Sequence, residues 1–453
     1  MHQREHFNSR LAIVLALAGS AIGLGNIWRF PYVVGEYGGA AFIIVYIAFS
    51  LCISLPIMLS ESIIGRHARK GVYCALRDLA PRRPWWKWAG LVAVLGAFII
   101  SSYYSVVGGW SVDYMMRALM KGFSPDAPDN VMGIFGRMSS SVWEPIAAHT
   151  IFLGLCAAIV MLGVKNGIER FNKFSIPLLF ILIVGMLVFS VNLPGARGGV
   201  EYLLKPDFSK MTAKGLSCAL GQSFFSMSLG IGAVLTYASY MKPDQGILSA
   251  GVWTTLFDAG FAIMAGFVVM PAVFSAGIAP GAGPSLVFES IPYIFAKMGA
   301  ASPLLARVAS VTFFLTILIA AVTSEISMLE VCVSQLVEQR QISRRKASIL
   351  VFILAWGLGV LCSLSFGVLG HVRILGSGIF EFFDQLSSNY IMLLGALAFA
   401  IFVGWQMKKA DVEAELTNGG SLRASSRLFK FLYPVIRYVI PPAIVLIFIT
   451  NLL

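Results

Sequence analysis

Residues 18–31 contain polar and charged side chains at positions where an ordinary membrane helix has apolar ones. The segment reads AGSAIGLGNIWRFP, and it combines three glycines with Asn26 and Arg29 in an otherwise apolar run. Glycine weakens a helix by about 1 kcal/mol per residue, and a polar or charged side chain in hydrocarbon is costly unless it has a partner. Backbone groups released by a helix break are tolerated in a membrane only where they line a cavity or bind something. The segment therefore predicts a binding site built on a broken helix.

A second segment, residues 226–232, repeats this pattern in the other half of the chain with the sequence SMSLGIG. Each break opens a block of five apolar segments, and a block with an odd number of spans must insert with the opposite orientation the second time. Interrupted segments at matching positions of two inverted halves indicate a transporter binding site. The alternative is close helix packing through small residues. Two matched breaks, one beside Asn26 and one beginning at Ser226, favour the binding site.

The composition defines the class of protein that must position these segments. Of 453 residues, 58% are hydrophobic and 12% are charged, and the mean hydropathy is +0.81. These values exclude a soluble globular protein and indicate an all-α polytopic membrane protein. The sequence contains eleven apolar segments long enough to span a membrane, at about 11–33, 40–64, 89–120, 146–163, 174–193, 215–240, 246–277, 302–337, 347–367, 377–407 and 431–453.

The net charge of +12 reflects membrane topology. Basic side chains gather in alternate loops, at about 66–87, 165–173, 340–346 and 408–427. By the positive-inside rule these loops are cytoplasmic, which puts the N-terminus inside and the C-terminus outside. A nucleic-acid role is excluded because the charges fall in short loops. We expect a cytoplasmic N-terminal segment, a first five-helix repeat, an extracellular loop, a second repeat, and a cytoplasmic loop with an eleventh helix, at 1–10, 11–193, 194–214, 215–408 and 409–453.

Several motifs resemble the neurotransmitter:sodium symporter family in its bacterial amino-acid branch, and the likeness runs from Arg4 to about Trp405. The motifs are REH at 4–6, GLGNIWRFP at 23–31, ExGGAxF at 36–42, QxFFS at 222–226, LTYASY at 235–240 and TS at 323–324. The resemblance implies the LeuT fold, a 5+5 inverted repeat with unwound helices 1 and 6. It also implies Na⁺-coupled uptake by alternating access across the bacterial inner membrane, and transporters of several hydrophobic amino acids are the most similar members.

The resemblance and the chemistry of an amino acid together predict a substrate site. The N-terminal ends of half-helices suit the carboxylate, and we expect the Tyr104 hydroxyl and the Gly25 N–H to bind it. The rest of the pocket is apolar, which predicts large neutral substrates, aliphatic or aromatic. The residues expected to contact substrate are Ser20, Ala21, Leu24, Gly25, Ile100, Tyr104, Val107, Phe225, Ser226, Ser228, Ile231, Ser324 and Met328.

Two Na⁺ sites are implied by the same resemblance. The first would use Ala21, Asn26, Ser226 and a group on the seventh span, where an ungapped alignment places Phe257 and a shift of one residue places Asp258. We expect Asp258, because an intramembrane carboxylate needs a cation partner; the alternative is a protonated, hydrogen-bonded Asp258. A fixed carboxylate there predicts independence from chloride. The second site would use Gly19, Ile22, Ala320, Thr323 and Ser324.

Gates and a moving segment are also implied. Arg29 and Asp384 would form the outer ionic gate, with Phe225 as an inner lid.

At the cytoplasmic end, Arg4 would pair with Glu338, with Tyr240 and Glu330 nearby. Gly167 and Pro177 would allow the start of span five to unwind and release the second sodium ion.

Glu61 would bind the unwound backbone of span six, whereas Glu325, which follows Ser324, has no assigned role.

The sequence leaves other functions open. A proton-coupled transporter of the same fold could titrate Glu325 or Asp258, and an amino-acid sensor could keep the site without transport. An enzyme is disfavoured because no histidine cluster, nucleophile elbow or metal motif is present. We expect an amino acid and the lipid bilayer as partners, Na⁺ as the bound ion, and neither an organic cofactor nor an obligate protein partner.

Overall fold

The structure is a computed structural model that describes residues 5–124, 128–277, 287–419 and 423–450. Within these residues the chain is helical, and β-structure is limited to two isolated bridges, Gly39 with Pro206 and Ile374 with Ser377. Nine helices are long and apolar enough to cross a membrane, and a tenth span is a pair of helices bent by 50° at residues 22–24. The remaining expected span, the sixth along the chain, is divided into two helices, both too short to cross alone. The predicted all-α membrane fold is confirmed.

The first half of the chain contains spans one to five. The first two are α1 (Arg10–Ala21) with η1 (Gly25–Arg29) and α2 (Phe30–Glu36), and α3 (Ala40–Phe49) with η2 (Ser50–Ser54) and α4 (Leu55–Ala68). The next three are α6 (Trp86–Met120), α8 (Trp143–Met161), and η3 (Val164–Glu169) with α9 (Arg170–Val191). The connecting helices are α5 (Val72–Leu79), α7 (Pro128–Ser140), α10 (Arg197–Leu204) and η4 (Phe208–Lys210).

The second half contains spans six to eleven. The first four are α11 (Ala213–Ser226) with α12 (Ala233–Ala238), α13 (Ile247–Ser275), α15 (Pro303–Arg340) and α16 (Arg344–Leu364). The tenth joins α17 (Ile379–Leu386), η6 (Ser387–Ile391), α18 (Met392–Ile401) and η7 (Phe402–Gln406). The eleventh joins α20 (Arg423–Pro434), η8 (Val435–Val439) and α21 (Ile440–Thr450). The connecting helices are α14 (Ser290–Ala301) and α19 (Lys409–Thr417).

Short hydroxyl side chains set where several of these helices begin. Ser9 accepts a hydrogen bond from the backbone of Ala12, and Thr212 accepts one from Gly215. Ser302 and Ser343 do the same for α15 and α16. Such caps satisfy N–H groups that have no partner within the helix, and each contributes about 1 kcal/mol. The capped ends fix where α1, α11, α15 and α16 begin, and the first three of these helices carry residues of the candidate site.

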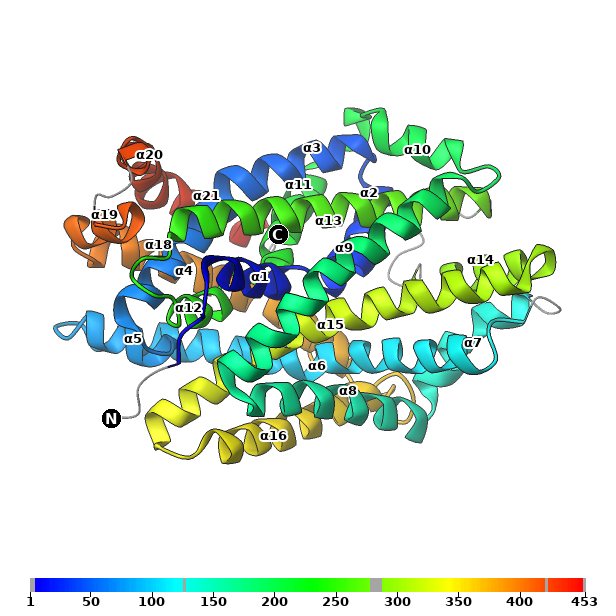
Figure 1. Ribbon diagram of the computed structural model, residues 1–453, viewed down its shortest axis with the longest axis horizontal. Helices are drawn as coiled ribbons and strands as arrows, with labels where there is room; N and C mark the ends of the chain where they lie inside the picture. The colour runs from blue at the N-terminus through cyan, green and yellow to red at the C-terminus, as the bar shows by residue number, and fades with distance from the viewer. Residues whose placement is uncertain (1–4, 125–127, 278–286, 420–422, 451–453) are drawn as a thin grey trace.

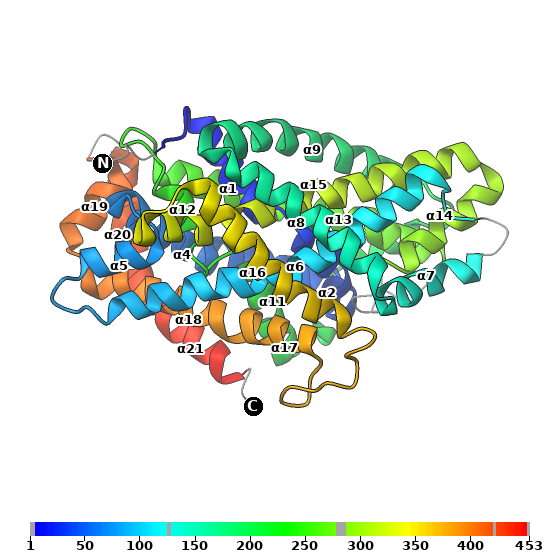
Figure 2. The ribbon, with the colours of Figure 1, turned by 90° about the horizontal axis from the view of Figure 1, so that it is seen from below.

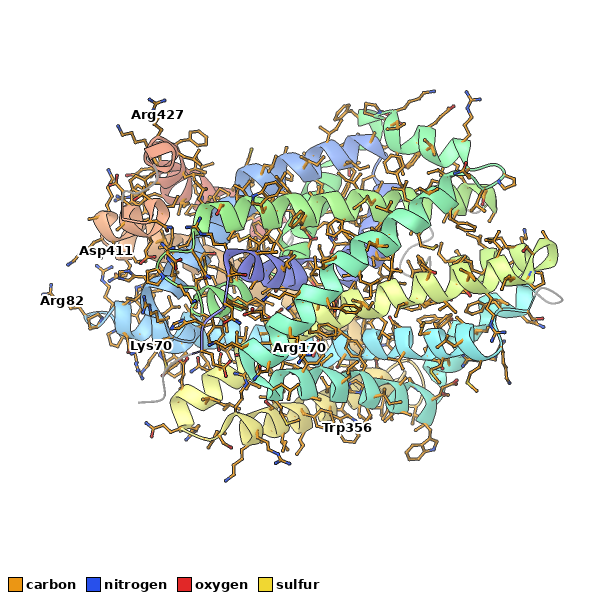
Figure 3. All side chains as sticks on the ribbon, viewed as in Figure 1. Lys70, Arg82, Arg170, Trp356, Asp411 and Arg427 are labelled. Atoms are coloured by element: carbon orange, nitrogen blue, oxygen red, sulfur yellow. The ribbon has the colours of Figure 1, made fainter. Side chains whose placement is uncertain are left out.

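The long helices run side by side along the long axis of the molecule (Figure 1). The N-terminus, α5, α19 and α20 lie at one end, and α7, α10 and α14 lie at the other; the turned view agrees (Figure 2). Figure 3 shows Lys70, Arg82, Asp411 and Arg427 at the first of these ends. The basic loops at about 66–87 and 408–427 therefore share one end of the bundle, and the α1 and α12 half-helices lie toward that end.

A buried arginine ties span two to the loop helix α19. Arg66 donates from Nε to Glu415 Oε2 at 2.6 Å, from Nη1 to Asn418 Oδ1 at 2.8 Å and to the carbonyl of Gln245, and from Nη2 to the carbonyl of Glu415. His67 Nδ1 lies 3.1 Å from the second carboxylate oxygen of Glu415. Burial opposes ionisation of Glu415, yet the hydrogen bonds from His67 and Arg66 outweigh it and hold the pKa of Glu415 below its usual range.

Arg66→Lys is expected to destabilise the protein by about 1.5–3 kcal/mol, because an ammonium group keeps the charge but cannot replace the forked guanidinium contacts. The measurement is the apparent unfolding temperature in detergent, with Arg69→Lys as the control on the same turn. Since the pKa of Glu415 is lowered on folding, the contribution of Glu415 is present above about pH 4 and is lost in stronger acid. The difference in unfolding temperature between wild type and Arg66→Lys should therefore shrink only in acid. An equal drop in unfolding temperature for Arg69→Lys would contradict the role assigned to Arg66.

Candidate functional site

The break in span six is held open by a carboxyl group from span two. Between α11 and α12, Ser228, Gly230 and Gly232 adopt positive φ of 52°, 82° and 73°. A side chain at Gly230 would also meet the carbonyl of Met392 at 1.9 Å, so this position requires glycine. Fully buried Glu61 accepts the Gly230 N–H at 2.7 Å and the Leu235 N–H at 3.3 Å. Glu61 therefore satisfies one backbone N–H within the break and one in α12 beyond it, as the resemblance implied.

A buried carboxylate cluster joins spans one, two, six and seven. Asp258 Oδ1 accepts hydrogen bonds from Asn26 Nδ2 and from the Ser226 hydroxyl, both at 2.7 Å. Its Oδ2 accepts a hydrogen bond from the Tyr46 hydroxyl at 3.0 Å. Asn26 Oδ1 in turn accepts the Gly23 N–H at 3.0 Å, within the first break. The carboxyl of Asp258 thus connects the two breaks to each other.

The neighbouring residue Phe257 takes no part in this cluster. Its ring packs against Phe180 and Trp253, at centroid distances of 5.6 and 5.7 Å. The residue that faces Asn26 and Ser226 is Asp258. Tyr46 belongs to the cluster but was not predicted, because a single tyrosine in an apolar segment gives no signal of its function.

A second cluster of oxygen atoms lies between the first break and span eight. The Ser324 hydroxyl is 3.4 Å from the carbonyl of Gly19 and 3.2 Å from the carbonyls of Ser20 and Ile22. The Thr323 hydroxyl is 3.2 Å from the carbonyl of Ile22 and 2.9 Å from that of Ala320. Each hydroxyl has only one proton to donate. Acceptors therefore outnumber donors here, an arrangement that favours a hard cation.

A small cavity of about 20 Å³ lies beside the two clusters. It is lined by Ala21, Gly23, Gly25, Ile100, Tyr104, Phe225, Ser226, Ser228, Ile231, Ser324, Met328 and Met392. Gly23 and Met392 were not predicted. Three expected residues, Ser20, Leu24 and Val107, are buried but do not line the cavity. The Ser20 side chain does not line the cavity because its hydroxyl donates to Ser327 at 2.8 Å. The space is too small for a large ligand unless the flexible methionines move.

Tyr104 reaches the first break from the middle of α6. Its hydroxyl oxygen accepts the Leu24 N–H at 3.0 Å. The carbonyl of Gly25 accepts a hydrogen bond from Gln222 Nε2 at 2.9 Å, which links the break to α11. Tyr104 therefore contacts the first break through Leu24, and its expected hydrogen bond to a substrate carboxylate stays a prediction. A tyrosine hydroxyl that accepts a hydrogen bond can still donate its own proton to an acceptor.

The outer gate was expected to pair Arg29 with Asp384, and within the described chain these two side chains form no direct ion pair. The Arg29 guanidinium lies over the Phe225 ring, 5.1 Å from its centre. Asp384 Oδ1 instead accepts a hydrogen bond from the Ser388 hydroxyl at 3.1 Å. A cation over an aromatic face is favourable, so Arg29 contacts Phe225, whose role as an inner lid stays a prediction.

At the other end of the bundle, Tyr240 donates to Glu330 Oε1 at 2.6 Å, and the Arg344 guanidinium holds both oxygens of Glu330. Glu338 Oε2 accepts the Gly71 N–H at 2.8 Å. The expected partner of Glu338, Arg4, lies outside the described residues. Arg344 was missed, since a basic residue beside a span is usually read as a topology signal.

The start of span five is helical throughout, as η3 and α9, and Pro177 lies within α9. A side chain at Gly167 would come within 2.0 Å of the Ile159 carbonyl. Gly167 therefore allows span five to pack closely on α8, and the unwinding of this segment stays a prediction.

Comparison with known proteins decides the family. The model of the sodium:neurotransmitter symporter family matches residues 4–130 and 137–453. The chain belongs to this family. An uncharacterised sodium-dependent transporter of Haemophilus influenzae is 36% identical over 461 residues, covering 99% of this chain and 98% of that protein. A similar Bacillus subtilis protein is 33% identical, covering 97% and 96%. A human sodium- and chloride-dependent taurine transporter is 26% identical, covering 88% of this chain and 71% of that protein.

A solved structure extends the family assignment to the fold. MhsT in complex with L-phenylalanine superposes with a TM-score of 0.90 at 38% identity, covering 99% of this chain and all of that one. This chain is therefore a sodium-dependent membrane transporter with the LeuT fold, and not an enzyme.

Proposed function

We propose that this protein couples Na⁺ entry to the uptake of a neutral amino acid, large and hydrophobic or aromatic, by alternating access and without chloride. The observation that carries the proposal is the arrangement around the first break. An apolar cavity adjoins two oxygen clusters, and both clusters use backbone or side-chain groups of residues 19–26. Ions and solute bound there would share one unwound segment, so that each would affect the binding of the other.

The first Na⁺ would bind at Asp258, Asn26, Ser226 and the carbonyl of Ala21. In the described arrangement the Asn26 amide nitrogen and the Ser226 hydroxyl proton both point to Asp258. Rotation of the amide and of the hydroxyl would turn these two donors into ligands. The second Na⁺ would bind the carbonyls of Gly19, Ile22 and Ala320 and the hydroxyls of Thr323 and Ser324, whose oxygens already converge.

The substrate carboxylate would lie at Tyr104 and the Gly25 N–H, next to the first Na⁺. Its side chain would extend toward the apolar wall formed by Ile100, Ile231, Met328 and Met392. None of the described residues that line the cavity is charged, which disfavours charged amino acids. The phenylalanine complex of MhsT supports an aromatic substrate.

Alternating access would move one five-helix repeat against the other, with repeats at 11–193 and 215–408. Arg29, Asp384 and Phe225 would close the outer path, and Glu338, Tyr240 and their partners would close the inner one. The basic loops at the α5 and α19 end would face the cytoplasm of a bacterial cell, leaving the C-terminus outside.

Uptake into proteoliposomes tests this function. We expect an inward Na⁺ gradient to drive accumulation of radiolabelled L-phenylalanine, and choline in place of Na⁺ at fixed pH to abolish it. Gluconate in place of chloride should leave the rate unchanged. Uptake driven by a proton gradient without Na⁺ would show a proton-coupled transporter, and Na⁺-dependent binding without flux would show a sensor.

Tyr104→Phe is expected to weaken substrate binding about 10- to 100-fold, because a hydrogen bond to a charged group contributes about 1.5–3 kcal/mol. Na⁺ binding in the absence of substrate should be retained. Competition binding of L-phenylalanine on purified protein measures both effects. Tyr103→Phe is the matched control, since the Tyr103 hydroxyl lies 3.1 Å from Ser387 and not at the first break. Equal losses in the two variants would argue against a substrate contact at Tyr104.

A further inference from the structure

A second, larger cavity lies apart from the site, at the α14 end of the bundle. Its volume is about 270 Å³, and it is bounded by the end of α6, the end of α14 and the start of α15. Its lining residues are Lys121, Gly122, Phe123, Phe295, Gly299, Pro303, Leu304, Ala306 and Arg307. None of these residues has a role in the proposed transport cycle.

Among the residues that the structure describes, both charged side chains that line this cavity, Lys121 and Arg307, are basic. The Lys121 side chain makes no hydrogen bond or ion pair with the part of the chain that the structure describes. Arg307 is held at the rim because its Nη2 donates to the carbonyls of Leu119 and Met120, which leaves other N–H groups of the guanidinium available. An anion is the ligand that this cavity suits.

The start of α15 adds to this positive character. The helix begins at Pro303 and continues to Arg340, and its first residues, Pro303 and Leu304, form part of the cavity wall. The N-terminal end of a helix carries a partial positive charge. A bound anion is therefore attracted by three groups at once: the helix end, Lys121 and Arg307.

The surroundings of the cavity are apolar and exposed. Leu304 is 75% exposed and Met120 is 67% exposed. On the same two helix ends, Leu305, Val308 and Leu119 are also exposed. In a membrane protein such side chains contact acyl chains, whereas a soluble anion gains nothing from them. The two features together describe a ligand with an anionic head and hydrocarbon tails.

We propose that this cavity binds an anionic phospholipid, with the headgroup phosphate at Lys121 and Arg307 and the acyl chains along the exposed apolar side chains of α6 and α15. Arginine and lysine both recognise phosphate, arginine through its fork and lysine as a point charge. A zwitterionic lipid brings its own ammonium group, which these two cations and the helix end repel. The site is therefore selective for a headgroup with net negative charge.

Native mass spectrometry of the full-length protein in detergent tests the proposal, with short-chain phosphatidylglycerol as the probe and phosphatidylcholine of equal chain length beside it. We expect phosphatidylglycerol to bind at least fivefold more tightly. Lys121→Gln should weaken its binding about fivefold, since one basic residue near a lipid surface contributes about 1 kcal/mol. Arg307→Gln should weaken it at least as much, and L-phenylalanine binding reports whether that variant is folded.

Lys297→Gln is the matched control, because Lys297 is an exposed cation on α14 that lies over the Tyr293 ring and does not line the cavity. It should leave lipid binding unchanged. Equal binding of the two lipids, or equal losses in Lys121→Gln and Lys297→Gln, would overturn the proposal. Displacement of the lipid by inorganic phosphate at equal concentration would assign the cavity to a soluble anion instead.

Discussion

Asp258→Asn is expected to abolish Na⁺-driven uptake and to raise the Na⁺ concentration for half-saturation at least 100-fold. The side chain is fully buried, and asparagine matches its size while removing its negative charge. Two unit charges 4 Å apart at an effective dielectric constant of 20 interact by about 4 kcal/mol, which corresponds to about 1,000-fold in affinity. The hydrogen bonds from Ser226 and Tyr46 each involve a hydroxyl that can turn, so we expect the variant to fold.

The measurement is Na⁺ titration of substrate binding on purified protein, with the unfolding temperature recorded in parallel. Phe257→Leu is the control, because its ring packs on Phe180 and Trp253 away from the cluster. A protonated, merely hydrogen-bonded Asp258 leads to the opposite expectation, since an amide replaces a neutral acid at little cost. Na⁺ affinity within threefold of wild type in Asp258→Asn would therefore support that alternative.

The two breaks could be predicted from the sequence because their residues are incompatible with a continuous membrane helix. Glycines, Asn26 and Arg29 in one apolar run have few explanations other than a site. The choice of Asp258 over Phe257 rests on the same physics, since a carboxylate cannot face lipid without a partner. Its placement against Asn26 and Ser226 agrees with that choice.

Residues whose role depends on packing between distant spans could not be predicted. Tyr46 meets Asp258 from a position 212 residues away, and Met392 reaches the cavity from α18. Nothing in their types distinguishes them from ordinary core residues. Ser20, in contrast, was predicted to contact substrate but does not line the cavity. Its hydroxyl bonds to Ser327. The rotation of α1 about its own axis decides which way this side chain points.

Glu325 is a buried carboxyl group that belongs to neither oxygen cluster. It is fully buried, and one of its oxygens accepts a hydrogen bond from Ser101 on α6. The other oxygen has no partner within the described chain. No role could be assigned to Glu325 from its sequence context, and the structure places it between α6 and α15, outside the residues that line the cavity.

Glu61→Ala is expected to lower uptake more than 100-fold and to destabilise the protein by about 3–6 kcal/mol. Both oxygens of Glu61 accept N–H groups, one from Gly230 within the break and one from Leu235 beyond it. Hydrogen bonds to a charged group contribute about 1.5–3 kcal/mol each. Alanine would leave two buried N–H groups without these acceptors, so that the unwound segment could no longer hold its shape.

Glu61→Gln separates this positioning role from simple packing. Glutamine keeps the size and one acceptor oxygen, but its amide nitrogen would face an N–H donor, so we expect about half of the loss in stability. Ser60→Ala is the matched control, because the Ser60 hydroxyl bonds only to the Pro56 carbonyl of its own helix. Unfolding temperature and the affinity for L-phenylalanine should fall together in the order wild type, glutamine, alanine. If glutamine equals wild type in both measurements, the paired contacts to Gly230 and Leu235 do not hold the break open.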